Sequence, residues 1–236
     1  MKIAGLQKMT LLDYPGKVAC TVFLQGCNFR CPFCHNSELL GGAGPEGLTQ
    51  EELLAFLKKR VGLLDAVCIT GGEPTLQKDL EQLLTQIRAL GYAIKLDTNG
   101  TRPEVVKSLA QKGLIDYVAM DIKNSPSRYA ETAGSQTLDI GALEETMGFL
   151  MGGDVDYEFR TTVVAQLHDA AAMQEIGQWL QRLSPDKKAK ALYLQGYMDR
   201  DTVLMGGLSA HSKEKMQEFK DILAPYVDKV ELRGMD

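Results

Sequence analysis

The sequence predicts an α/β domain built on a parallel sheet. Short segments rich in apolar and β-branched residues alternate about six times with longer segments of helical period, an order typical of βαβ units. The apolar segments are nearly continuous, as expected for strands covered on both faces. The chain of 236 residues contains no second core, internal repeat or long polar linker. We therefore expect a single domain over residues 1–236.

Each expected strand is one of these apolar runs: 18–24, 66–70, 92–97, 115–122, 157–164 and 191–195. The helices between them are expected at 49–60, 80–90, 103–109, 139–151, 169–183 and 211–224. The first helix opens with a capping box, in which Thr49 is the N-cap and Glu52 follows three residues later. Pro103 suits the first turn of its helix. The glycine-rich segment 39–47 is expected to be a connecting loop.

Six βα units are fewer than the eight of a complete barrel, so the sheet is expected to be either an open partial barrel or doubly wound. In both folds, ligands bind at the carboxyl ends of the strands. Polar or glycine residues follow each expected strand in turn: Gly26–Cys27, 70–74, 97–100, Asp121 with Lys123, Arg160, and Gln195–Gly196. The sequence therefore predicts one cavity shared by all six strand ends.

The composition is that of an ordinary globular protein, with 44% hydrophobic and 24% charged residues. The net charge of −5 gives no general attraction to nucleic acid or to anionic membranes. No apolar run reaches the roughly 20 residues needed to span a bilayer, and the first residues lack the apolar region of a signal peptide. We expect a cytoplasmic protein with no nucleic-acid or membrane partner.

Three of the five cysteines fall in the segment 26–36, GCNFRCPFCHN, on the loop after the first strand: Cys27, Cys31 and Cys34. Thiolates bind zinc or iron–sulfur clusters. A structural zinc site needs a fourth ligand, and His35 is poorly placed for that role beside Cys34. The other two cysteines, Cys20 and Cys68, lie in expected strands and are interpreted as core residues. An iron–sulfur cluster held by three cysteines would leave one iron free for a ligand.

These motifs resemble those of the radical S-adenosylmethionine (SAM) enzymes, in which C-x₃-C-x₂-C follows the first strand and GGEP the second. Segment 11–36, LLDYPGKVACTVFLQGCNFRCPFCHN, is most similar to the glycyl-radical-enzyme activases that act on anaerobic ribonucleoside-triphosphate reductase. The GGEP, DTNG and MDIK sequences at 71–74, 97–100 and 120–123 strengthen the resemblance. It extends at least as far as Arg160.

The resemblance implies a partial (β/α)₆ TIM-like barrel whose open side admits a loop of a partner protein. It also implies a [4Fe–4S] cluster on Cys27, Cys31 and Cys34, with SAM bound to the free iron. Reductive cleavage of SAM would give a 5′-deoxyadenosyl radical, which would abstract hydrogen from a glycine of the partner, a glycyl-radical enzyme. A flavodoxin or ferredoxin is the electron donor that the family implies.

The resemblance also implies roles for individual residues around SAM. Phe33 would contact the adenine, Gly71 and Gly72 would allow close approach of the methionine moiety, and Glu73 would pair with its ammonium group. The remaining expected cofactor residues are His35, Asp97, Thr98, Asn99, Asp121, Lys123 and Arg160. A monovalent cation is an additional expectation, bound by Asp97, Thr98, Met120 and Asp121.

Simpler interpretations stay open for several of these residues. Phe33 is equally explained as an aromatic that buries the loop, Asp97 and Asn99 as parts of a strand-end turn, and Asp121 with Lys123 as a surface ion pair. Arg160 lies among apolar residues, so it needs an anion from the cofactor or from the protein. Gln195 stands where pyruvate formate-lyase activases carry a His. His168 and His211 lie beside expected helix starts, and we expect both at the surface.

Alternative functions are a pyruvate formate-lyase-type activase and a radical SAM enzyme acting on a small molecule, such as the deazapurine-forming enzymes. A non-catalytic zinc or electron-transfer module is a third possibility. The absence of any His/Asp or Ser/His constellation in the sequence favours chemistry supplied by cofactors over acid–base catalysis.

Overall fold

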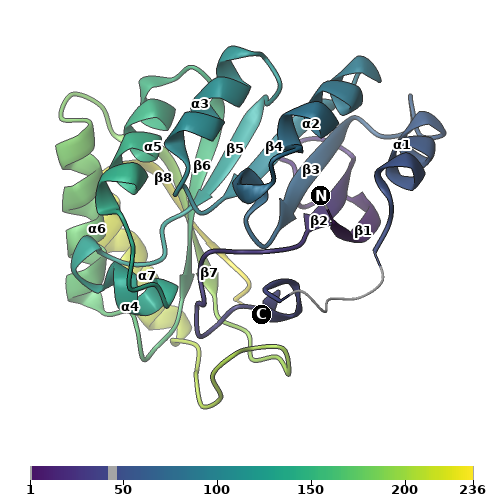
Figure 1. Cartoon of the computed structure of the whole chain (residues 1–236). Coiled ribbons are helices and arrows are strands. Elements are labelled where there is room, and N and C mark those ends of the chain that lie inside the picture. The colour runs from purple at the N-terminus through teal and green to yellow at the C-terminus, as the bar shows by residue number, and fades with distance from the viewer. Residues whose placement is uncertain (1, 42–46, 236) are drawn as a thin grey trace.

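The computed structural model describes residues 2–41 and 47–235, and in this part of the chain the strands form one curved sheet (Figure 1). Their order in space follows their order in the sequence: β1 (Ile3–Thr10), β2 (Ala19–Leu24), β3 (Ala66–Gly71), β4 (Ala93–Thr98), β5 (Tyr117–Asp121), β6 (Asp156–Val163), β7 (Ala189–Gly196) and β8 (Val227–Arg233). Strand β1 is antiparallel to β2, and every other neighbouring pair is parallel.

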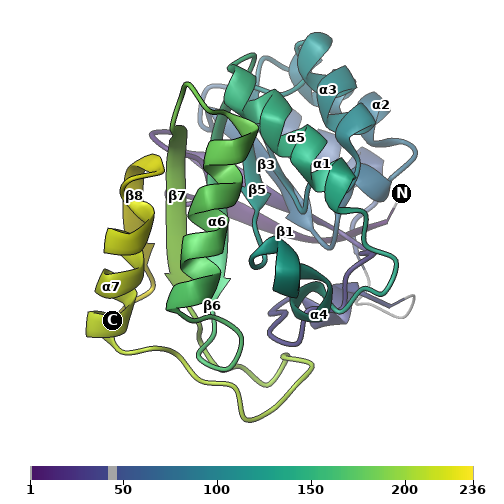
Figure 2. The ribbon, with the colours of Figure 1, turned by 90° about the vertical axis from the view of Figure 1, so that its left-hand side faces the viewer.

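Helices connect the successive parallel strands and lie outside the curved sheet (Figures 1 and 2). They are α1 (Gln50–Lys58), α2 (Leu80–Ala89), α3 (Pro103–Gln111), the short α4 (Tyr129–Ala133), α5 (Ile140–Gly152), α6 (Ala170–Leu183) and α7 (Lys213–Leu223). The capping box predicted for α1 is present: the Glu52 amide donates to Thr49 Oγ1 over 3.1 Å, and the Thr49 amide donates to Glu52 Oε2 over 2.8 Å.

This topology is that of a partial barrel, as predicted. In a doubly wound sheet the strand order reverses at a switch point, whereas here it runs from β1 to β8 without reversal. The predicted strands and helices are present, with ends that differ by at most two residues. The two edge strands, β1 and β8, were not predicted. Exposed polar residues interrupt both of them, for example Asp228 and Lys229 in β8, so neither is a continuous apolar run.

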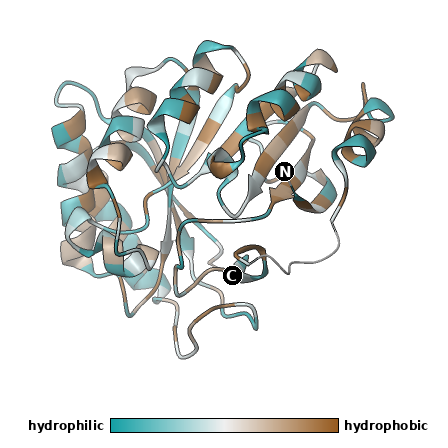
Figure 3. Cartoon of the chain, viewed as in Figure 1, coloured by the Kyte–Doolittle hydropathy of each residue, from teal (hydrophilic) through white to brown (hydrophobic). Residues whose placement is uncertain are grey.

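The main core lies between the sheet and the helices and includes Phe159, Trp179 and Phe219. Figure 3 shows that hydrophobic and hydrophilic residues alternate along the helices. Cys20 belongs to this core, and Cys68 to a small cluster with Tyr14. Both cysteines are buried core residues, as predicted.

Two charged side chains, Lys95 on β4 and Glu158 on β6, are buried with at most 2% exposure. Each lies two residues before another charged residue of its strand, Asp97 and Arg160, and therefore on the same face of the sheet. The charged residues Lys95 and Asp97 on β4, and Glu158 and Arg160 on β6, therefore lie on one face of the sheet toward the carboxyl ends of these strands.

No helix in the described part of the chain is long and apolar enough to cross a membrane. The predicted glycine-rich loop 39–47 falls partly outside the described residues, which exclude 42–46.

Candidate functional site

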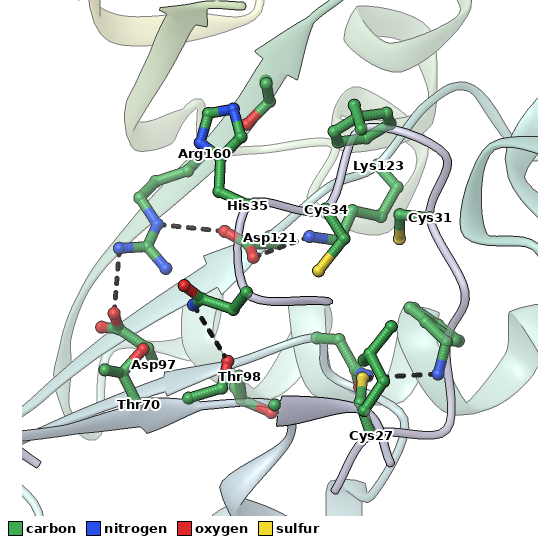
Figure 4. Close-up of a pocket in the computed structure, with 18 of the residues that line it drawn as sticks. Cys27, Cys31, Cys34, His35, Thr70, Asp97, Thr98, Asp121, Lys123 and Arg160 are labelled. Atoms are coloured by element: carbon green, nitrogen blue, oxygen red, sulfur yellow. Dashed lines mark hydrogen bonds and ion pairs between the residues drawn. The ribbon is translucent and has the colours of Figure 1, made fainter. Parts of the chain in front are cut away.

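A cavity of about 260 Å³ lies at the carboxyl ends of the central strands, beneath the loop that carries the three cysteines (Figure 4). The strands contribute Thr70, Gly71, Asp97, Thr98, Asp121, Arg160, Thr162 and Gln195 to its wall. The loop contributes Cys27, Phe29, Cys31, Phe33, Cys34, His35 and Asn36. The cavity therefore brings together every predicted cofactor or cluster residue except Glu73 and Met120.

Close contact with the end of β3 positions the cysteine loop. The amide of Glu73 donates to the carbonyl of Gly26 over 2.7 Å, and the amide of Gly72 donates to the carbonyl of Leu24 over 2.9 Å. A methyl group on Gly72 would lie 2.1 Å from the Gly26 oxygen and 3.2 Å from Cys27 Cβ. Glycine at position 72 is thus required by the contact between two segments of the protein itself.

The three cysteine side chains of the loop face one cavity. Thiolates around one tetrahedral zinc lie about 3.8 Å apart, given a Zn–S distance of about 2.3 Å. In the part of the chain that the structure describes, no group of three His, Cys, Asp or Glu side chains is placed to hold a single metal ion. Cys27, Cys31 and Cys34 all line the cavity, while Cys20 and Cys68 are buried in strands.

Hydrogen bonding and burial shape the chemistry of these thiols. The amide of Phe29 lies 3.4 Å from Cys27 Sγ and donates to it. Burial raises the pKa of Cys31 to about 11 and also raises that of Cys27, while the nearby Lys123 ammonium opposes both shifts. The neutral thiols are therefore stable in the free protein, and metal binding, which requires thiolates, must release protons.

Five charged side chains form a network at the strand ends, and four of them line the cavity while Lys95 lies buried behind it. Arg160 bridges two carboxylates, with Nη1 3.1 Å from Asp97 Oδ2 and Nε 3.0 Å from Asp121 Oδ1. Lys123 Nζ lies 2.9 Å from Asp121 Oδ2, and Lys95 Nζ lies 3.0 Å from Asp97 Oδ1. The dashed lines between Arg160 and the two carboxylates in Figure 4 mark the centre of the network. The members that line the cavity, Asp97, Asp121, Lys123 and Arg160, are two carboxylates and two cations.

The network is partly withdrawn from solvent, so its charges interact strongly. Burial tends to raise the pKa of Asp121, but Lys123 and Arg160 outweigh it and lower the pKa to about 2. The pKa of Asp97 is lowered as well, against the effect of burial, by Arg160 and Lys95. The side chains of Lys123 and Asp121 are 17% and 28% exposed, so they form a cavity-lining pair and not an open surface pair. Protein carboxylates supply the anion that Arg160 requires.

Glu73 lies outside the cavity wall. Its side chain is 1% exposed, and its Oε1 accepts hydrogen bonds from the Thr75 amide, over 3.0 Å, and the Thr98 hydroxyl, over 2.8 Å. Its Oε2 accepts from the Asn99 amide over 2.6 Å. The carboxylate therefore joins the end of β3 to the end of β4.

Met120 also lies outside the cavity wall. It is fully buried, and a methyl group on Gly100 would lie 2.2 Å from Met120 Cε. The side chain thus packs against the turn after β4, on the face of β5 opposite to Asp121. The prediction that His168 lies at the surface was wrong, because its side chain is 1% exposed.

A long loop between β7 and α7, residues 197–212, was not identified from the sequence as part of the site. His35 Nε2 donates to the Met198 carbonyl over 2.8 Å, and Thr202 Oγ1 donates to the His35 carbonyl over 2.9 Å. The amide of Met205 donates to the Pro32 carbonyl over 3.0 Å. The β7–α7 loop therefore holds the cysteine loop from outside. Loops of this length without regular structure are uncommon and often functional.

Other wall residues were also missed, although some had a signal in the sequence. Thr162 lies two residues after Arg160 in the same strand, so alternation alone places both on the cavity face. Thr70 directly precedes Gly71 at the end of β3. Asn36 follows the cysteine motif, and its side-chain amide donates to the Gly71 carbonyl over 3.3 Å. The contact between Asn36 and Gly71 could be identified only from the folded structure.

Comparison with known proteins agrees with this site. The family model described as the radical SAM superfamily matches residues 21–144, more than half of the chain. A Methanocaldococcus jannaschii protein described as a candidate glycyl-radical enzyme activating enzyme is 30% identical over 245 residues, covering 99% of this chain and 96% of its own. The pyruvate formate-lyase-activating enzyme of Clostridium pasteurianum is 34% identical over 132 residues, covering 52% of each chain.

The fold is shared with solved structures of low sequence identity. A radical SAM methyltransferase from Sphaerobacter thermophilus superposes with a TM-score of 0.73 at 17% identity, covering 96% of this chain and 68% of the other. That likeness bears on the barrel alone. The family match and the full-length relative show that the chain belongs to the radical SAM superfamily of enzymes.

Proposed function

We propose that the protein activates a glycyl-radical enzyme, and that its partner is an anaerobic ribonucleoside-triphosphate reductase. Membership of the radical SAM superfamily implies a [4Fe–4S] cluster and SAM. Together these groups supply, when bound, a one-electron reductive cleavage that generates a radical able to abstract hydrogen. The residues of the cavity bind and orient them.

Cys27, Cys31 and Cys34 would hold the cluster, and their chemistry fits it. Three thiols line one cavity without a fourth cysteine beside them, which leaves one iron of a four-iron cluster open to a ligand. The Phe29 amide, which donates to Cys27 Sγ, would favour the thiolate form of that ligand.

The single observation that carries the cofactor assignment is the charge network. Two cations, Lys123 and Arg160, and two carboxylates, Asp97 and Asp121, line the cavity together, so it suits a ligand that carries charges of both signs. SAM is such a ligand, with cationic sulfonium and ammonium groups and an anionic carboxylate. Arg160 and Lys123 line the cavity and are the cations within reach of it.

A monovalent cation at Asp97, Thr98, Met120 and Asp121 remains a finer prediction. It would share both carboxylates with Arg160, which already lies within 3.1 Å of each. Met120 would contribute its main-chain carbonyl alone, because its side chain packs against Gly100. The sulfonium centre of SAM carries a positive charge of its own, so the two carboxylates can serve the cofactor without an added ion.

The open edges of the sheet support a protein substrate. The described sheet ends at β1 and β8, which are not neighbours in its order, so the barrel is not closed by pairing between them. A glycine in a partner's loop must approach the reacting carbon closely, and an open side gives it a path. The full-length relative and the likeness of segment 11–36 favour this partner class. A flavodoxin or ferredoxin is proposed as the electron donor.

The choice between the two activase branches rests on Gln195. This residue lines the cavity at the end of β7, where the pyruvate formate-lyase activases carry a His. An amide cannot change its charge near neutral pH, whereas imidazole can. The residue at the end of β7 therefore differs in chemistry from the His of the pyruvate formate-lyase activases, and this difference favours the reductase branch.

Electron paramagnetic resonance tests the proposal. Reconstituted protein, SAM and a chemical reductant are incubated anaerobically, in parallel, with an anaerobic ribonucleoside-triphosphate reductase and with pyruvate formate-lyase. We expect a glycyl-radical signal on the reductase, and none when Cys31→Ala replaces the wild type. A signal on pyruvate formate-lyase alone would move the assignment to that branch. Absence of signal on both, with turnover of a small metabolite, would contradict it.

A further inference from the structure

His168 is a buried histidine that takes no part in the cavity wall. It lies between β6 and α6, one residue before the N-cap Asp169, and its side chain is 1% exposed. Burial lowers its pKa. A histidine kept neutral in the interior requires partners for both ring nitrogens.

The partners of His168 define which ring nitrogen carries the proton. Nε2 lies 2.8 Å from the carbonyl oxygen of Lys123, which can only accept, so Nε2 is the donor. Nδ1 lies 3.1 Å from the amide nitrogen of Val164, which can only donate, so Nδ1 is the acceptor. One neutral tautomer, with the proton on Nε2, satisfies both contacts, and the Val164 carbonyl oxygen, 3.3 Å from Nδ1, accepts from the His168 amide over 2.9 Å.

These two contacts tie together the ends of the two strands that carry the charge network. Lys123 follows β5, which ends at Asp121, and Val164 follows β6, which carries Arg160. The last sheet hydrogen bond between these strands runs from the Ile122 amide to the Arg160 carbonyl over 2.8 Å. His168 extends the connection beyond that point, where no strand pairing continues in the described structure.

Other side chains anchor the residues around Lys123. Tyr129 OH donates to the Asp121 carbonyl over 3.1 Å, Thr161 Oγ1 to the Ile122 carbonyl over 2.8 Å, and the Asn124 side chain to the Leu167 carbonyl over 2.9 Å. The bond to the carbonyl of Lys123 itself comes from His168. The Lys123 carbonyl orients the backbone from which the ammonium group reaches Asp121 at 2.9 Å.

We propose that His168 is a positioning residue for the cofactor site, and that its Nε2–H, by holding the Lys123 carbonyl, places Lys123 and Asp121 opposite Arg160. The inference rests on the proposed cofactor site. His168 would thus stabilise the site from outside the cavity, from the connection between β6 and α6.

Two substitutions separate this role from simple packing. In His168→Gln the terminal amide nitrogen stands near the position of Nε2 and keeps the bond to Lys123, while the contact with Val164 is lost. In His168→Asn the shorter side chain keeps an acceptor for the Val164 amide and loses the bond to Lys123. Each variant removes the ring and one hydrogen bond, so both should lose similar thermal stability and retain full iron content.

We expect His168→Asn to weaken SAM binding by about tenfold relative to His168→Gln, the change given by loss of one buried hydrogen bond. Equilibrium dialysis of reconstituted protein, without reductant and hence without turnover, measures it. Equal affinity in the two variants would overturn the inference and leave the proposed function in place. Failure of the wild type to bind SAM would overturn both.

The protonation of the His168 ring gives a second test, which uses wild-type protein and does not depend on the folding of a variant. In wild-type protein labelled with ¹⁵N-histidine, long-range ¹H–¹⁵N correlation should show His168 neutral with its proton on Nε2. A proton on Nδ1 would leave no donor for the Lys123 carbonyl and would overturn the inference.

Discussion

Replacing Asp121 with Asn tests the charge network that lines the cavity. Asp121 accepts from Arg160 over 3.0 Å and from Lys123 over 2.9 Å. An amide keeps the shape of the side chain and removes its charge. Arg160 then retains Asp97 alone, and Lys123 loses its ion-pair partner, so Asp121→Asn should destabilise the fold.

The size of the effect follows from the pKa of Asp121, which is lowered from 3.8 to about 2. A difference of about 1.8 units at 1.36 kcal/mol per unit is about 2.4 kcal/mol. With 28% of the side chain exposed, solvent screening reduces it to about 2 kcal/mol. For a chain of this length, that loss lowers the melting temperature by roughly 4–8 °C.

The pH dependence has a definite sign. Because the folded pKa lies below the unfolded one, the stabilisation is complete above about pH 4 and is lost as the pH falls toward about 2. Thermal unfolding of wild type and Asp121→Asn, followed by circular dichroism, should therefore differ by a constant amount between pH 6 and 8. The difference should shrink below pH 4.

Asp156→Asn is the matched control. Asp156 pairs with Lys190 at 2.6 Å, but these side chains are 66% and 59% exposed, so the variant should lose only about 0.5 kcal/mol. Equal melting temperatures for Asp121→Asn and Asp156→Asn would refute the reasoning, as would a difference that grows below pH 4.

Four further substitutions test the cysteine loop and its support. Gly72→Ala should lower the iron content severalfold, because the methyl group would lie 2.1 Å from the Gly26 oxygen; full iron loading would contradict this. Cys31→Ala should abolish iron binding and Cys68→Ala, buried in β3, should spare it; iron loss in the latter would disprove the ligand set. Glu73→Gln should cost about 1–3 kcal/mol in unfolding experiments, since a backbone amide donates to each carboxylate oxygen; wild-type stability would show that these bonds matter little.

The central strands could be predicted from the sequence because both their faces are covered. A run such as 66–70 is apolar at nearly every position, whereas β8 exposes Asp228, Lys229 and Glu231 at the sheet edge. An edge strand is buried on one side alone and therefore lacks the signal on which the prediction relied.

The site residues could be predicted because parallel strands end at one edge of the sheet. What each polar group contacts could not, since those contacts join distant segments. Glu73 is held by Thr98 and Asn99, 25 and 26 residues away. His168 meets the carbonyl of Lys123, 45 residues away. Sequence spacing gives no information on such pairs, and His168, expected at the surface, is buried.

The central claim is that the protein removes hydrogen from a glycine of a partner enzyme. An anaerobic ribonucleoside-triphosphate reductase with glycine deuterated at the α-carbon is incubated anaerobically with the reconstituted protein, SAM and reductant, and 5′-deoxyadenosine is analysed by mass spectrometry. The account predicts one deuterium in the 5′-deoxyadenosine, and none from a reductase whose radical-site glycine is replaced by alanine. Deuterium-free 5′-deoxyadenosine from the labelled reductase, together with transfer from a deuterated small metabolite, would contradict it.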